Sequence, residues 1–198
     1  MLRPVVKPTN KNFSSGPCAK RPGWSFESLK KATLGRSHRA NISKKKLFKL
    51  IKLTKEILRL PKDYIVGIVP GSDTGAVEMS MWNFLGPNGV TSLVWDSFSK
   101  DWSEDLSKQL RFTKLNIISA DYGKLPDLSS INFNDDIIFN WNGTTSGVRI
   151  PDTNWIPFDR KGITICDATS AAFAMEIDWT KLDVSAFSWQ KCLGGEAG

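Results

Sequence analysis

Residues 162–170, GITICDATS, decide the fold that this sequence predicts. The run GITIC is short and apolar, which is typical of a buried strand, and polar residues follow it at once. The same succession recurs at residues 136–147, where DIIFNW is followed by NGTTSG. Buried strands that each end in a polar loop indicate an open α/β sheet, in which ligands bind beyond the carboxyl ends of the strands.

The flanking sequence extends this pattern in both directions. Further strands are predicted at residues 64–69 (YIVGIV), 92–95, 115–119 and 184–189. Helical patterns follow the turn at residues 71–75, as far as Leu85, and at residues 101–110. Strands that alternate with helices favour a three-layer α/β/α fold with a mainly parallel sheet.

The first third of the chain differs from the rest in charge. Residues 1–62 hold 17 lysines and arginines against two acidic residues, whereas the remainder holds 10 against 18. Apolar residues recur at helical spacing in residues 43–60, which predicts a basic amphipathic helix that begins near Ser43 and ends before Pro61. We therefore expect an N-terminal arm and helix over residues 1–60 and a ligand-binding domain over residues 61–198. A basic nucleic-acid-binding module is the alternative function for this segment.

Several classes of protein are excluded or disfavoured by composition. No apolar run is long enough to span a membrane, and the first residues lack the apolar stretch of a secretory signal. Three widely spaced cysteines form no disulfide framework, so we expect a reducing, cytoplasmic environment. His38 is the single histidine, which makes a histidine-based metal site or a Ser-His-Asp triad a poor expectation.

Four features of the sequence could form one site. They are the turn at residues 71–75 (GSDTG), the loop at residues 142–147, Asp167 after its strand, and Lys191 after the last strand. A helix N-terminus can hold a phosphate, a carboxylate can pair with a protonated ring nitrogen, and a desolvated lysine can form a Schiff base. Each feature alone also has an ordinary explanation as a turn, a helix cap or a surface lysine.

In the order and the residues of its motifs, the sequence resembles the phosphoserine aminotransferase family. This family belongs to class V of the fold-type I enzymes that use pyridoxal 5'-phosphate (PLP). The matching segments are residues 12–17 (NFSSGP), 37–39 (SHR), 167–170 (DATS), 188–191 (SWQK) and 194–195 (GG). The resemblance covers nearly all of this chain but only about half of a family member. It implies the PLP-binding large domain, with the C-terminal small domain missing, so that this fragment alone would be inactive.

The resemblance also implies roles for residues around the cofactor. Lys191 would form the Schiff base with PLP, and Asp167 would pair with the pyridine nitrogen. Asp73 and Thr74 would lie at the cofactor phosphate, although many family members carry arginine at the Thr74 position, where it helps to hold the substrate phosphate. Gln190 would also contact the cofactor phosphate.

The remaining implied contacts involve the cofactor ring and the substrate. Thr144 would contact PLP near its ring, and Phe98 would stack on the ring, with Trp102 as the rival. Arg39, with His38 beside it, would bind a carboxylate or phosphate of the substrate. No metal is expected.

The implied reaction is transfer of an amino group between glutamate and 3-phosphohydroxypyruvate, which gives O-phosphoserine for serine biosynthesis. A second role in pyridoxine biosynthesis is a further implication of the resemblance. The family resemblance also implies a homodimer, with no nucleic-acid or membrane partner. Another class V enzyme, such as an alanine–glyoxylate or serine–pyruvate aminotransferase, is the alternative. A cysteine desulfurase is disfavoured because no loop cysteine is evident.

Overall fold

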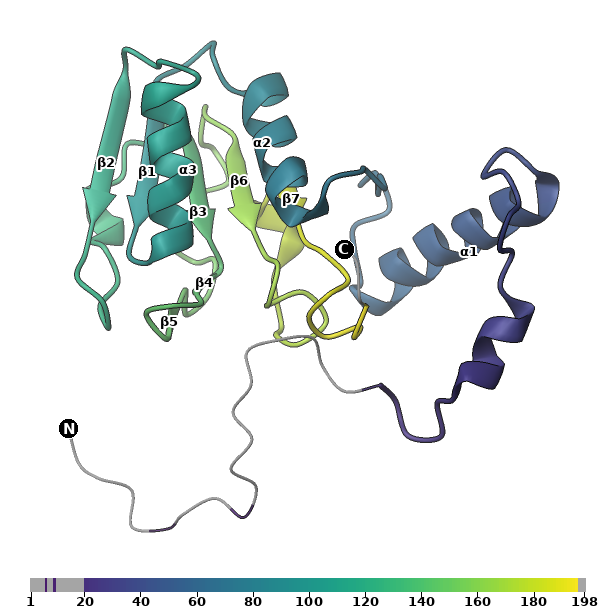
Figure 1. Cartoon of the computed structure of the whole chain (residues 1–198). Helices are drawn as coiled ribbons and strands as arrows, with labels where there is room; N and C mark the ends of the chain where they lie inside the picture. Colours follow the sequence, from purple (N-terminus) through teal and green to yellow (C-terminus); the bar gives the residue numbers. More distant parts are fainter. Residues whose placement is uncertain (1–5, 7–8, 10–19, 196–198) are drawn as a thin grey trace.

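The computed structural model describes residues 6, 9 and 20–195. The motif at residues 12–17 and Cys18 lie outside the described residues. The described chain begins with an arm that contains a short 3-10 helix, η1 (Phe26–Lys31), and the helix α1 (Asn41–Ile57). In Figure 1 these elements extend away from a sheet-containing body formed by the rest of the chain.

A five-stranded parallel sheet forms the centre of that body. Its strands are β1 (Val90–Val94), β2 (Leu115–Ser119), β3 (Asp136–Asn140), β6 (Thr164–Asp167) and β7 (Val184–Ala186), in the order β2-β1-β3-β6-β7. All four pairings are parallel. A two-stranded antiparallel hairpin, β4 (Asn142–Gly143) with β5 (Val148–Arg149), follows β3. The parallel sheet predicted from the sequence is confirmed.

Alternation along the strands gives the sheet two apolar faces. In β3, Ile138 points to one core, whereas Ile137 and Phe139 point to the other. Helices α2 (Ser72–Phe84) and α3 (Ser97–Lys108) cover the first face (Figure 1). The opposite face is covered mainly by loops, together with the short 3-10 helices η2 (Leu128–Ser130) and η3 (Trp179–Lys181). Both faces are therefore buried at the central strands β1, β3 and β6, whereas the edge strand β2 is partly exposed.

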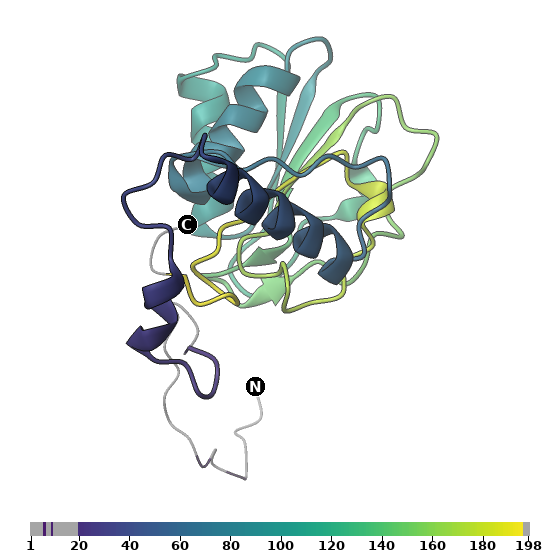
Figure 2. The ribbon, with the colours of Figure 1, turned by 90° about the vertical axis from the view of Figure 1, so that its right-hand side faces the viewer.

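The basic helix is present where the periodicity predicts it, with different ends. Helix α1 has Ala40 rather than Ser43 at its N-cap, and Ser43 is buried inside it. Leu58 closes the helix and packs into the core, ahead of Pro61. Figure 2 shows α1 in front of the sheet-containing body when the molecule is viewed from the side. The helical prediction is confirmed, and the proposed division of the chain at residue 60 stays a prediction.

One predicted strand is wrong. Residues 64–69 form no strand, and Ile65 is 94% exposed. The segment is held instead by Tyr64, whose hydroxyl donates to the carbonyl oxygens of Trp179 at 2.7 Å and Leu182 at 2.9 Å. An apolar run becomes a buried strand only when a neighbouring strand pairs with it, and here β7 remains the edge of the sheet.

Candidate active site

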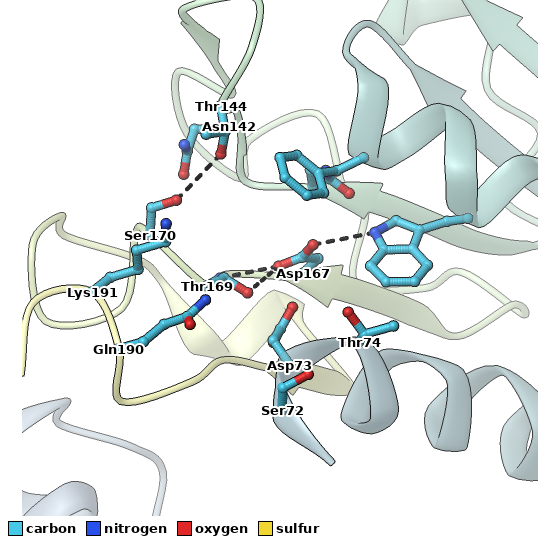
Figure 3. A pocket seen from close by; sticks show the side chains of 13 residues that line it. Ser72, Asp73, Thr74, Asn142, Thr144, Asp167, Thr169, Ser170, Gln190 and Lys191 are labelled. Carbon is cyan, nitrogen blue, oxygen red and sulfur yellow. Dashed lines mark hydrogen bonds between the residues drawn. The ribbon is translucent and has the colours of Figure 1, made fainter. Parts of the chain in front are cut away.

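The carboxyl ends of the parallel strands open onto one cavity. Because the strands run in the same direction, the loops that follow β1, β3, β6 and β7 meet at the same edge. The N-terminus of α2 reaches this edge as well (Figure 3). The lining residues are Ser72, Asp73, Thr74, Phe98, Trp102, Asn140, Asn142, Thr144, Asp167, Thr169, Ser170, Gln190 and Lys191.

All seven residues that the sequence predicts around a cofactor line this cavity. They are Asp73, Thr74, Phe98, Thr144, Asp167, Gln190 and Lys191. Segments that are far apart in the sequence therefore come together as the sheet topology predicts. What each of these residues binds stays a prediction.

The turn before α2 gives the cavity an anion-binding end. Gly71 adopts φ 98°, a left-handed conformation that favours glycine, and α2 starts at the next residue. The first backbone N–H groups of a helix have no partner within it, and the helix dipole adds partial positive charge there. The N-terminus of α2 can thus accept a phosphate group, with Ser72, Asp73 and Thr74 beside it.

Asp167 ends β6 and is fixed by three hydrogen-bond donors. Its Oδ1 accepts from the Thr169 backbone N–H at 3.1 Å and from the Thr169 hydroxyl at 2.7 Å. Its Oδ2 accepts from Nε1 of Trp102 at 3.2 Å. The carboxylate is only 8% exposed, so these donors hold it in one orientation at the cavity wall (Figure 3).

Asp73 is a second buried carboxyl group in the same wall. It is 7% exposed, and its Oδ1 has no hydrogen-bond partner among the described residues. Burial, followed by the nearby negative charge of Asp167, raises the pKa of Asp73 to about 7. The sequence places Asp73 at the site but gives no sign of this change in its acidity.

The two candidate stacking residues have different surroundings. Phe98 is 45% exposed and lines the cavity, so a face of its ring is available to a ligand. Trp102 is 5% exposed, and its indole N–H is engaged with Asp167. The geometry therefore favours Phe98 over Trp102 for stacking against a flat ligand.

Lys191 and Gln190 reach the cavity from a tight turn after β7. The Gly194 N–H donates to the Lys191 carbonyl oxygen at 2.9 Å, and the Gly195 N–H donates to that of Trp189 at 2.8 Å. Lys191 is half-buried. Across the cavity mouth, the hydroxyls of Thr144 and Ser170 are 3.4 Å apart. A second cavity adjoins the first and shares Thr144, Ser170 and Lys191 with it.

The two predicted substrate-binding residues lie elsewhere. His38 and Arg39 are exposed, belong to the arm before α1, and line neither cavity. The backbone N–H of Arg39 donates to the Ser37 hydroxyl at 3.1 Å, which shapes a local turn. The structure does not bring this pair to the site, and their role stays a prediction.

Sequence reasoning missed part of the lining. Asn140, the last residue of β3, is buried, and its Nδ2 donates to Oδ1 of Asp96 at 3.4 Å. The available signal was its place at the end of an apolar strand, directly before Trp141. No group of three potential metal ligands occurs within residues 20–195, and no helix in the described chain is long and apolar enough to cross a membrane.

Comparison with known proteins agrees with the geometry. No family model matches the chain. It is 57% identical to phosphoserine aminotransferases of Methanosarcina barkeri and Methanosarcina mazei over 195 residues, which is 98% of this chain and 53% of each relative. The chain thus spans about half the length of the curated relatives it matches.

Solved structures share the fold. A phosphoserine aminotransferase from Cytophaga hutchinsonii matches with a TM-score of 0.76 and 27% identity over 87% of this chain and 48% of that protein. Pyridoxamine-pyruvate aminotransferase from Mesorhizobium loti matches with a TM-score of 0.77 at 17% identity, over 93% of this chain and 48% of that one. The predicted resemblance and the fold-type I architecture are both confirmed.

Proposed function

We propose that this chain is the cofactor-binding part of a phosphoserine aminotransferase, which transfers an amino group between glutamate and 3-phosphohydroxypyruvate to give O-phosphoserine. The observation that carries the proposal is the convergence of Lys191, Asp167 and the N-terminus of α2 on one cavity at the carboxyl edge of a parallel sheet. The 57% identity to named phosphoserine aminotransferases supports it.

The residues of the cavity fit pyridoxal 5'-phosphate. The cofactor carries a phosphate, a ring nitrogen that can be protonated and an aldehyde. The N-terminus of α2 suits the phosphate, and the buried Asp167 carboxylate suits a ring N–H. Lys191 supplies an amine, and Phe98 supplies an exposed ring face. When bound, the cofactor supplies an electron sink for the carbanion formed at the substrate Cα.

The chain's own residues would supply binding and proton transfer. Asp167 would hold the proton on the ring nitrogen, while Thr169 and Trp102 keep its carboxylate in place. Lys191 would bind the cofactor in the resting site and would then carry the proton between the substrate Cα and the cofactor carbon that bears the aldehyde. Gln190 and Thr144 would orient the cofactor from opposite sides of the cavity.

The adjoining cavity offers room for the substrate beside Lys191. It shares Lys191 and Thr144 with the cofactor cavity and adds Arg149, Met175 and Cys192. We also propose Arg39 and His38 for the substrate anion, in the complete protein rather than within the described arrangement. A homodimer, a cytoplasmic location, the absence of nucleic-acid partners and a second role in pyridoxine biosynthesis are further parts of this proposal.

The test is reduction with borohydride. The full-length protein that contains this sequence is incubated with PLP, reduced, digested and mapped by mass spectrometry. We expect the pyridoxyl group on Lys191 and, in a Lys191→Ala control, no specific label. Scattered labelling of surface lysines with Lys191 unmodified would refute the proposal.

The second candidate, another class V aminotransferase, is separated from the first by its substrate. It would prefer unphosphorylated 2-oxo acids such as glyoxylate or pyruvate. Turnover of 3-phosphohydroxypyruvate should exceed turnover of hydroxypyruvate if the proposal is right. Faster turnover of hydroxypyruvate would instead favour another class V aminotransferase.

A further inference from the structure

Two carboxyl groups share the inner wall of the cavity. Asp73 and Asp167 are 7% and 8% exposed, and the negative charge of Asp167 raises the pKa of Asp73. Two adjacent carboxylates that are both shielded from water repel each other strongly, so such a pair tends to keep one proton. The structure also indicates which of the two keeps it.

The hydrogen-bond donors are distributed unequally between the two groups. Three donors point at Asp167: the backbone N–H and the hydroxyl of Thr169, and the indole N–H of Trp102. Asp73 has hydrogen bonds only with the side chains of Thr169 and Asp167, and its Oδ1 has no partner among the described residues. Hydrogen bonds donated to a carboxyl group favour its charged form, whereas burial with fewer donors and beside another carboxyl group favours the neutral form. The proton is therefore placed on Asp73.

The groups on the neighbouring elements agree with this assignment. From β6 and its loop, Asp73 is approached by Asp167, Thr169 and Cys166; burial and the two carboxyls raise the pKa of the Cys166 thiol well above its usual value, so it is neutral. From the turn after β7, Gln190 and the cation Lys191 line the same cavity. Trp102 on α3 and Asn140 on β3 add only neutral groups.

We propose that Asp73 is a positioning residue for Asp167. Asp73 carries the one proton that the pair holds, so that the pair has a single negative charge. Asp73 remains a neutral acid when a phosphorylated ligand binds. This inference rests on the proposed function. Asp73 is the second residue of α2, where the helix N-terminus would receive the ligand phosphate. A neutral Asp73 does not repel the ligand phosphate and can donate a hydrogen bond to it, whereas an ionised Asp73 would repel the phosphate.

The proposal makes ligand binding depend on pH in a defined direction. Because the pKa of Asp73 is about 7 before the ligand binds, the group is increasingly ionised above neutral pH and must take up a proton on binding. The affinity for a phosphorylated ligand should then fall with rising pH, by up to about tenfold per pH unit above 7. Asp73→Asn, which imitates the neutral acid, should lack this dependence.

The experiment uses the full-length protein and pyridoxine 5'-phosphate, which has no aldehyde and cannot couple to Lys191. Isothermal titration calorimetry from pH 6 to pH 9, in two buffers with different heats of ionisation, gives the affinity and the number of protons taken up. The wild type is compared with Asp73→Asn and with Glu78→Gln, a change on the exposed surface of the same helix. The ligand's own titrations are common to all three proteins and cancel in the comparison.

We expect the wild type and Glu78→Gln to lose about fivefold more affinity than Asp73→Asn between pH 7 and pH 8, and to take up more protons at pH 8. Parallel pH profiles with equal proton counts would overturn the inference. If Asp73→Asn does not fold, infrared difference spectroscopy of the wild-type protein replaces it: a protonated-carboxyl band should be present at pH 6 and lost by pH 9, and absence of the band at pH 6 would also overturn it. Failure of the proposed function is distinct, because then the ligand would not bind at any pH and Lys191 would stay unlabelled.

Discussion

Replacing Asp73 by asparagine should make folding less sensitive to pH. Asp73 has an ordinary pKa of 3.8 when unfolded and a pKa of about 7 in the folded cavity. The folded state therefore holds the proton more tightly, so stability is greatest at low pH and falls as the pH rises from about 4 to about 7. At 1.36 kcal/mol per pKa unit, the full loss is about 4 kcal/mol. Asparagine cannot ionise and should avoid this loss.

The assay is urea unfolding of the full-length protein without cofactor, at pH 5 and pH 8, followed by circular dichroism. About 3 kcal/mol of the loss falls between these two pH values. The free energy of unfolding of Asp73→Asn, relative to the wild type, should therefore rise by about that amount from pH 5 to pH 8. Titrating groups that are not in contact with Asp73 contribute equally to both proteins. A difference that does not change with pH would show that Asp73 ionises freely, and the reasoning would be refuted.

Three further substitutions test other contacts. Trp102→Phe removes the donor to Asp167 and should lower the free energy of unfolding by about 1.5–3 kcal/mol at pH 7, because a buried hydrogen bond to a charged group contributes about that much; an unchanged free energy in urea unfolding would contradict this role. Tyr64→Phe removes the donor to the carbonyls of Trp179 and Leu182 and should lower the free energy of unfolding by about 1–2 kcal/mol at pH 7 in urea, and a change near zero would argue against an anchoring role for the segment. Gly162→Ala would place a Cβ 1.7 Å from the Asp135 carbonyl oxygen and should cost about 1–3 kcal/mol or more, whereas the control Gly67→Ala, with nothing within 4 Å, should change stability by less than about 0.5 kcal/mol; equal effects on thermal unfolding would count against the close approach.

The sequence was sufficient to predict the parallel sheet and most of the cavity wall. Polar residues directly after apolar strands predicted where ligand-binding groups lie, and parallel strands bring such groups to one edge whatever their separation along the chain. Asp167 and Lys191 are the clearest cases: each follows a short apolar run, and both line the same cavity. The family resemblance added the chemistry, which periodicity alone could not supply.

The errors have physical causes that single-sequence patterns do not contain. The run at residues 64–69 is as apolar as a strand, but strand formation depends on a pairing partner that the sequence does not reveal. Helix α3 was expected at residues 101–110 and begins at Ser97. Its capping box, in which Asp96 accepts from the Ser99 N–H at 2.9 Å, corresponds in the sequence to an Asp three residues before a Ser.

The protonation state of Asp73 could not be predicted from the sequence, for a different physical reason. Asp73 and Asp167 are 94 positions apart in the numbering, and only the packing of α2 against β6 and β7 brings them into one buried wall. Acidity depends on burial and on neighbouring charges, which are properties of the folded arrangement. A sequence can identify a carboxyl group in a site, but it does not indicate whether that group carries a proton.

The packing of α2 has a consequence for how the protein is made. Helix α2 precedes every strand of the sheet in the chain, yet it lies against β6 and β7, the last two strands to be synthesised. During translation the apolar face of α2 cannot pack against β6 and β7 until those strands leave the ribosome. Contacts between such distant segments also form slowly. The cavity, with its anion-binding end on α2 and its lysine after β7, is thus completed late in synthesis, so we expect nascent chains that end before Lys191 to be prone to aggregation and unable to hold the cofactor.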